Sequence, residues 1–213
     1  MEVIVVANVE QQGEIASKNT NPEAKLVFAK SLSASEPVDK YDAIFYLPDD
    51  LIDQEMEKFG GKPVFINSVI ETLEQKKWPL NFSRINGWPG FLQRDTWEVA
   101  SNNKALAGKV FESLRWNIVF VKDEPGLVAT RVISMIINEA FFALEEGVST
   151  IDEIDLAMKL GTNYPYGPFE WQHKIGLQNI YHLLKSMSLK DKRYAVSPLL
   201  EKKYFELTSS QKI

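Results

Sequence analysis

The sequence predicts an α/β domain with a largely parallel sheet, followed by an all-helical domain. Two patterns support this expectation. Short apolar runs alternate with polar helical segments in the first half, and from Glu124 onward apolar residues recur at helical spacing. A Pro125-Gly126 turn separates the two patterns. Of the 213 residues, 45% are apolar and 25% are charged, which indicates a packed globular chain rather than a disordered one.

Seven strands are expected in the first domain. Several are continuous apolar runs, and strands of that kind are buried on both faces, as in a parallel sheet covered by helices. Helical stretches are expected at 49–59, where Asp49 and Asp50 form a typical capped start after Pro48, and at 103–114. The expected strands are 2–7, 25–29, 42–47, 63–67, 82–85, 96–100 and 117–121.

Five helices are expected in the second domain. Gly147 and Gly161 close the first two, and a rigid turn of Pro165, Gly167 and Pro168 leads into the third. The domain boundary therefore falls at residues 122–125, which gives an α/β domain of residues 1–122 and a helical domain of residues 123–213. In order, the helices are expected at 130–146, 150–160, after 168, at 176–184 and at 198–207.

Composition and charge exclude several classes of function. The net charge is −5, and no cluster of basic and aromatic residues suited to a nucleic acid is present. The chain has no cysteine, and the nine-residue spacing of its only histidines, His173 and His182, fits no metal-ligand motif, so neither a thiol nucleophile nor a metal site is expected. We see no export signal and no membrane span, and we expect a cytoplasmic location.

The predicted helix at 130–146 is apolar around more than one face. A helix packed on one side shows a narrower stripe, so later helices or another chain must cover the second surface. The rest of the helical portion is short and offers a modest core. We therefore expect a two-fold dimer through the helical portion. The apolar residues are Val132, Ile133, Met135, Ile136, Ile137, Ala140, Phe141, Phe142, Ala143 and Leu144.

Five motifs follow one another at fixed spacing: residues 119–131, Asn138-Glu139-Ala140, residues 144–148, residues 154–157 and residues 164–170. Together they resemble the carboxy-terminal domain of the 3-hydroxyacyl-coenzyme A dehydrogenases. The resemblance implies an NAD-binding, Rossmann-like amino-terminal domain followed by the helical domain through which that family dimerises. It also implies a place in fatty-acid and acyl-CoA metabolism.

The amino-terminal domain resembles the same family more weakly. Residues 41–51 and 64–68 match two of its strands, and residues 84–99 lie where the family has its catalytic segment. There the resemblance implies a histidine that takes the hydroxyl proton and a glutamate that orients it. Glu98 matches the glutamate, but Asn86 stands at the histidine position, and an amide cannot accept the proton. The family's polar substrate-binding positions carry Val69, Pro89 and Thr130.

The family's glycine-rich NAD turn also has no counterpart. Its three glycine positions fall on Ala7, Val9 and Gln12, and a β-branched Val9 fills space that a pyrophosphate needs. Glu10 adds a negative charge beside the phosphate position, and Lys30 stands near the place of the acidic residue that binds the ribose. Too little chain lies between Lys30 and Val38 for the family's helical excursion and third strand, so the domain is trimmed. We therefore expect no cofactor.

Three hypotheses for function follow. The first is a degenerate family member without independent NAD-dependent dehydrogenase activity, with acyl-CoA as a candidate ligand and a second copy or a catalytically complete paralogue as partner. The second is an active NAD-dependent 3-hydroxyacyl-CoA or 3-hydroxybutyryl-CoA dehydrogenase, or an enzyme that uses Glu98, Asp95 or Asp123 for other chemistry. The third is a protein-interaction module, indicated by the Phe141-Phe142 pair and five tryptophans.

Overall fold

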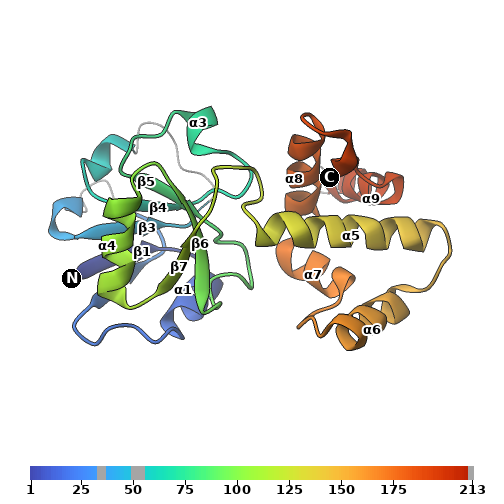
Figure 1. Ribbon diagram of the computed structural model, residues 1–213, viewed down its shortest axis with the longest axis horizontal. Coiled ribbons are helices and arrows are strands. Elements are labelled where there is room, and N and C mark those ends of the chain that lie inside the picture. The colour runs from blue at the N-terminus through green and yellow to red at the C-terminus, as the bar shows by residue number, and fades with distance from the viewer. Residues whose placement is uncertain (33–36, 49–55, 211–213) are drawn as a thin grey trace. The chain divides into compact units, whose positions relative to one another are not determined.

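The computed structural model describes residues 1–32, 37–48 and 56–210 (Figure 1). The chain divides into two compact units, Met1–Leu127, here called the sheet unit, and Val128–Ile213, here called the helical unit. The predicted α/β domain followed by an all-helical domain is confirmed.

The sheet unit contains all seven predicted strands. Their order across the sheet is β2-β1-β3-β4-β5-β6-β7. Neighbouring strands run parallel, except that β5 and β6 are antiparallel. The strands are β1 (Glu2–Val6), β2 (Lys25–Ala29), β3 (Ala43–Tyr46), β4 (Val64–Asn67), β5 (Phe82–Ile85), β6 (Thr96–Ser101) and β7 (Asn117–Phe120).

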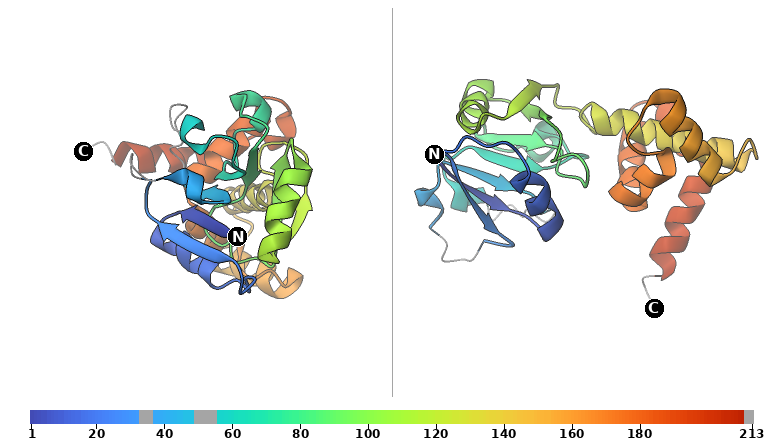
Figure 2. Two further views of the ribbon diagram at one scale, coloured as in Figure 1. Left: turned by 90° about the vertical axis from the view of Figure 1, so that its left-hand side faces the viewer. Right: turned by 90° about the horizontal axis from the view of Figure 1, so that it is seen from below.

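Both faces of the central strands are buried, as the continuous apolar runs predict. On one face Phe45 stacks on Phe65 with ring centres 4.7 Å apart, and this cluster includes residues of helices α1 (Val9–Ala16) and α4 (Lys104–Leu114). Figures 1 and 2 show these two helices beside the sheet. The opposite face packs against the short elements η1 (Val38–Lys40), η2 (Glu57–Phe59) and α3 (Leu73–Lys76). Trp88, Trp97 and Trp116 are also buried in this unit, so they do not form the surface that the interaction-module hypothesis needs.

Three helical segments of the sheet unit differ from expectation, and one of them, the short helix α3, has no counterpart among the expected elements. Helix α1 was not anticipated, because Gly13 and two glutamines interrupt its apolar pattern; its capping residue, Asn8, is the signal that marks it. The helix expected at 49–59 falls largely outside the described residues, as do its start residues Asp49 and Asp50. Within the described part, Glu57–Phe59 forms the 3-10 turn η2.

The helical unit contains the five expected helices. They are α5 (Ala129–Glu145), α6 (Ile151–Thr162), α7 (Pro168–Ile175), α8 (Leu177–Ser188) and α9 (Pro198–Ser210), with a 3-10 turn η3 (Lys192–Tyr194) before the last. Gly161 does not close α6, as the sequence suggested. The helix continues to Thr162 and ends at Asn163, which adopts a left-handed conformation with φ 55° that asparagine tolerates well.

Candidate functional site

The carboxyl ends of β1 and β2 are bridged by a side-chain amide of the chain itself. Gln12 Nε2 donates to the carbonyl of Ala7 at 2.8 Å and to that of Ala29 at 3.2 Å. In open parallel sheets, ligands bind outside the carboxyl ends of strands at the point where strand order reverses. β1 is such a point, because β2 and β3 lie on its two sides. The Gln12 amide therefore donates hydrogen bonds to backbone carbonyls at the edge of the sheet where folds of this kind bind a nucleotide.

The amino-terminus of α1 is closed by a reciprocal pair of hydrogen bonds. Asn8 Oδ1 accepts from the Gln11 backbone N–H at 2.9 Å, and the Asn8 backbone N–H donates to Gln11 Oε1 at 3.1 Å. Val9 is 68% exposed, and Glu10 lies in the first turn. A helix amino-terminus binds phosphate through unpaired N–H groups and positive dipole charge. Here the chain's own side chain satisfies one of those groups, and Glu10 offsets the dipole charge.

A buried amide network joins the same edge of the sheet to the segment after β5. Gln11 Nε2 donates to the Gly87 carbonyl at 2.9 Å, and Asn67 Oδ1 accepts from the Gly87 N–H at 2.9 Å. A Cβ atom at Gly87 would lie 2.7 Å from the Asn67 side chain, so only glycine fits there. This network fixes the backbone that directly follows Asn86.

Asn86 directly follows β5, and Glu98 lies in β6, the antiparallel neighbour of β5. The last pair of the ladder is Ile85 with Val99, so each of the two residues is the chain neighbour of one member of that pair. Asn86 is buried, and its Oδ1 accepts from the backbone N–H of Trp88 at 3.2 Å. Glu98 is half-buried. The two positions that correspond to the predicted acid–base pair thus lie at the same end of the β5–β6 ladder, with an amide in place of the imidazole.

The loop after Asn86 is held by a carboxylate that the sequence did not single out. Glu14 accepts from the backbone N–H groups of Gly90 at 2.6 Å, Leu92 at 3.0 Å and Gln93 at 3.3 Å. Three converging N–H groups form an anion-binding concavity, and an internal carboxylate fills it. Half-buried Pro89 lies in this loop and has no side-chain polar atom. The loop is therefore fixed by hydrogen bonds to Glu14, and Pro89 contributes no donor.

Arg84 is the most deeply buried cation among the described residues, and sequence reasoning missed it. Its side chain is fully buried on β5, where Nη1 contacts the Asp123 carboxylate at 2.5 Å. Nε and Nη2 donate to the carbonyls of Ser68 at 2.7 Å and Val69 at 3.0 Å. Burial lowers the pKa of Arg84, and the bond to Asp123 opposes that shift. A charged residue inside the apolar run of β5 is the signal that could have identified it.

The remaining candidate residues have separate environments. Val69 is buried and accepts the Gly126 N–H at 2.7 Å, so its backbone has a structural role. Thr130 belongs to the helical unit, where it is fully buried in the first turn of α5. Asp123 is bound to Arg84, whereas Asp95 is exposed.

The two histidines have separate hydrogen-bond partners in the part of the chain that the structure describes. His173 Nδ1 contacts the Phe169 carbonyl at 2.8 Å, and His182 Nε2 contacts the Tyr204 hydroxyl at 3.3 Å. No group of three histidine, aspartate or glutamate residues able to hold a metal ion occurs among the described residues. Likewise, none of the described helices is both long and apolar enough to cross a membrane.

Motif residues of the helical unit connect its helices. Asp155 of α6 accepts from the N–H groups of Phe169 at 2.7 Å and Glu170 at 3.1 Å, which caps α7. A Cβ atom at Gly167 would lie 2.4 Å from the Asp155 side chain, so the glycine permits this approach. Asn138 of α5 donates to the Ala195 carbonyl at 2.9 Å. Each of these residues joins two separate segments of the helical unit. The fixed spacing of the motifs therefore follows from the packing of these segments.

Comparison with known proteins assigns the helical unit. Residues 126–212 match the family model described as 3-hydroxyacyl-CoA dehydrogenase, C-terminal domain. Residues 126–212 therefore form a domain of the 3-hydroxyacyl-CoA dehydrogenase C-terminal type. The 3-hydroxyadipyl-CoA dehydrogenase of Escherichia coli K12 is 41% identical over 88 residues, which are 40% of this chain and 18% of that protein. The probable 3-hydroxybutyryl-CoA dehydrogenase of Bacillus subtilis 168 is 38% identical over 107 residues, 49% of this chain and 36% of that protein.

The fold extends the likeness across both units. The crystal structure of (S)-3-hydroxybutyryl-CoA dehydrogenase from Ralstonia eutropha matches with a TM-score of 0.65 and 21% identity, and covers 84% of this chain and 69% of that one. This match shows a shared fold, with the sheet unit as a Rossmann-like domain. The matched part of this chain spans 18% of the length of the Escherichia coli relative and 36% of that of the Bacillus subtilis relative.

Proposed function

We propose that this chain is a degenerate 3-hydroxyacyl-CoA dehydrogenase of fatty-acid and acyl-CoA metabolism, without independent NAD-dependent activity. The observation that carries the proposal is the pair of hydrogen bonds from Gln12 to the carbonyls of Ala7 and Ala29. A dinucleotide pyrophosphate needs open backbone at this turn and a free helix amino-terminus. Asn8 caps that helix, and the side chain of Val9 stands where the backbone must be approached. These residues do not fit NAD.

The proton-transfer position supports the same proposal. Oxidation of a 3-hydroxyl group requires a base for the hydroxyl proton, and Asn86 offers only an amide. Its oxygen already accepts the Trp88 N–H. Glu98, on the adjacent strand β6, has no imidazole at position 86 to orient. Val69, Pro89 and Thr130 stand at the family's substrate-binding positions, and of these only Thr130 has a polar side chain, which is fully buried.

Under this proposal the chain keeps the family's helical domain as its means of association. The partner is a second copy, with a catalytically complete paralogue as the alternative, and acyl-CoA is the candidate ligand. The apolar surface of α5 supports association, since Val128 is 51% and Val132 47% exposed. The alternative function is an active NAD-dependent dehydrogenase in which Glu98 is essential. The position of Glu98 on β6, at the end of the β5–β6 ladder that Asn86 follows, favours this function as the second candidate.

Separate measurements of NADH binding and of 3-hydroxybutyryl-CoA turnover test the proposal. We expect no saturable NADH fluorescence change below millimolar concentration and no oxidation of 3-hydroxybutyryl-CoA. Thermal stabilisation by acetoacetyl-CoA, measured without nucleotide, tests acyl-CoA binding by itself, because a ligand that binds only the folded state raises its apparent stability. Micromolar NADH binding would refute the inference that the nucleotide turn is closed. Turnover by the unmodified chain that Glu98→Gln abolishes would establish the active enzyme instead.

A further inference from the structure

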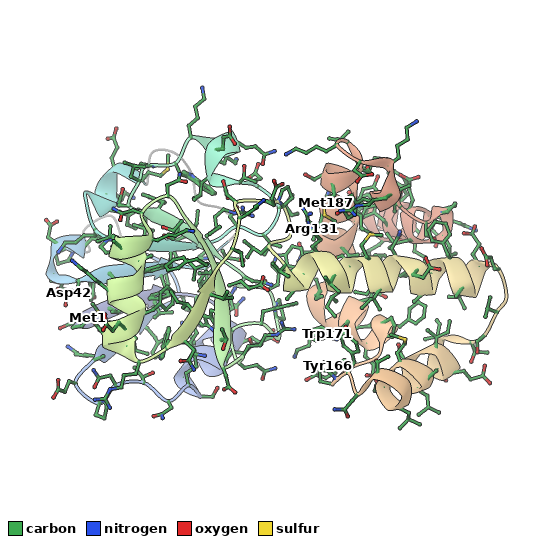
Figure 3. The ribbon with its side chains drawn as sticks, viewed as in Figure 1. Met1, Asp42, Arg131, Tyr166, Trp171 and Met187 are labelled. Atoms are coloured by element: carbon green, nitrogen blue, oxygen red, sulfur yellow. The ribbon has the colours of Figure 1, made fainter. Side chains whose placement is uncertain are left out.

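Strand β2 lies at one edge of the seven-stranded sheet, next to β1. In a parallel pair, alternate residues of an edge strand bond to its neighbour, and the residues between them face away. The Lys25 N–H donates to the Met1 carbonyl at 2.9 Å, and Figure 3 shows Met1 at the end of the sheet where β1 and β2 begin. At the other end, the Ala29 carbonyl accepts from the Ala7 N–H at 2.9 Å. The odd-numbered residues of β2 therefore bond to β1.

The two even-numbered residues of β2, Leu26 and Phe28, direct their backbone N–H and carbonyl groups away from β1. None of these groups bonds to another residue within the ranges 1–32, 37–48 and 56–210. The Phe28 side chain is 36% exposed, and Leu26 is half-buried. A row of unpaired backbone groups beside apolar side chains is a template to which another strand can add. We call this row the β2 edge.

The opposite edge of the sheet, β7, carries a charge of the kind that natural sheets use against strand addition. Lys104 Nζ of α4 lies 5.7 Å from the ring centre of Phe120 in β7. A lysine at an edge opposes pairing, because a second strand would take its ammonium group out of water. The β2 edge has neither a charged residue nor a proline between Lys25 and Lys30. Lys25 is itself bound to Glu2 of β1 at 3.0 Å. Of the two edges, β2 is therefore the one open to pairing.

The β2 edge is complementary to a second copy of itself. In an antiparallel pair, outward-facing residues must lie opposite one another, and a two-fold axis beside Val27 places Leu26 opposite Phe28 of the partner subunit, and the reverse. Each of these pairs exchanges both of its N–H···O bonds and packs leucine against phenylalanine. Lys25 lies opposite Ala29 of the partner subunit, so no like charges meet. The same axis places Val27 opposite Val27 of the partner subunit, with the two Cα atoms about 4.5 Å apart.

We propose that two copies of this chain pair through their β2 edges, antiparallel and centred on Val27, so that their two sheets become one. This surface belongs to the sheet unit and is separate from the association proposed above for the helical unit. An identical partner suits the edge because one register satisfies its backbone groups, its apolar side chains and its charges together. An extended segment of a different protein would leave the β2 edges of two copies apart.

Single cysteines test both the surface and the register, because the chain has no cysteine of its own. Under mild oxidation at tens of micromolar, Val27→Cys should give a disulfide-linked dimer, since about 4.5 Å between Cα atoms suits a disulfide. In Phe28→Cys the two cysteines are diagonal neighbours about 7–8 Å apart, which is too far. Val119→Cys is the matched control, in the middle of β7 at the opposite edge. We expect at least about 10-fold more linked dimer from Val27→Cys than from either of the others.

A second substitution in the Val27→Cys chain separates strand pairing from chance collision. Phe28→Pro removes an outward N–H that β1 does not use, and Phe28→Lys adds a charge at the same position. Each should lower the linked fraction at least about 10-fold while circular dichroism shows a folded chain. The use of two substitutions keeps the test valid if the proline variant does not fold.

Three results would overturn the proposal: absence of linkage at residue 27, linkage at residue 28 or 119 as strong as at residue 27, or linkage that Phe28→Lys does not reduce. A segment of another protein as the natural occupant would appear as the first of these results. The cross-link reports on the β2 edge alone, whereas NADH titration and turnover report on the proposed loss of activity. Either proposal can therefore fail without the other.

Discussion

Replacing Arg84 by methionine should strongly destabilise the sheet unit. The fully buried guanidinium binds the Asp123 carboxylate and two backbone carbonyls, those of Ser68 and Val69. Methionine keeps much of the aliphatic volume but leaves these acceptors without their donor. Breaking a buried ion pair from one side costs about 3–5 kcal/mol. Because Asp123 is 22% exposed, water compensates part of that loss, and we expect about 3 kcal/mol.

That loss is a large fraction of the roughly 5–15 kcal/mol that stabilises a typical domain. Urea unfolding followed by tryptophan fluorescence measures it, since Trp78, Trp88, Trp97 and Trp116 all belong to the sheet unit. The matched control is Lys76→Met, which removes an exposed ion pair with Glu71 at 3.0 Å and should cost at most about 1 kcal/mol. If Arg84→Met costs no more than this control, the reasoning about the buried pair is wrong.

Three further changes test the catalytic position and the helical unit. Asn86→His should not create measurable 3-hydroxybutyryl-CoA oxidation, because the nucleotide turn remains closed; activity in a coupled NADH assay would contradict this. Asp155→Ala should lower the free energy of unfolding by about 2–3 kcal/mol, because two N–H groups of α7 lose their acceptor, whereas Asp152→Ala on the same helix should cost less than about 1 kcal/mol in urea titrations. Lys159 and the Gly167 N–H hold the pKa of Glu170 below its ordinary value of 4.5, so its stabilising effect is present above that pH and lost as pH falls through the lower folded value. Glu170→Gln should therefore reduce the loss of thermal stability between pH 6 and pH 3, and an unchanged pH dependence would exclude that linkage.

The order and type of most elements could be predicted from local patterns in the sequence. The strands were recognisable because residues such as Val3, Phe45 and Phe65 form apolar runs buried on both faces of the sheet. The helices of the second unit followed from apolar spacing and from caps such as Thr150. The family resemblance rested on local motifs, and these include residues such as Asp155 whose hydrogen bonds to α7 require fixed spacing.

The contacts between polar side chains that are distant in the sequence could not be predicted in this way. The reach of Gln12 to Ala29 depends on the parallel pairing of β1 with β2, which no local pattern encodes. The position of Arg84 within a predicted strand is visible in the sequence, but its partner is not, because Asp123 lies 39 positions away. Glu14 likewise acquires its role from a loop 76 positions away. Propensity and periodicity act over neighbouring residues, whereas these hydrogen bonds form only when packing of the sheet brings separate segments within 3 Å or so.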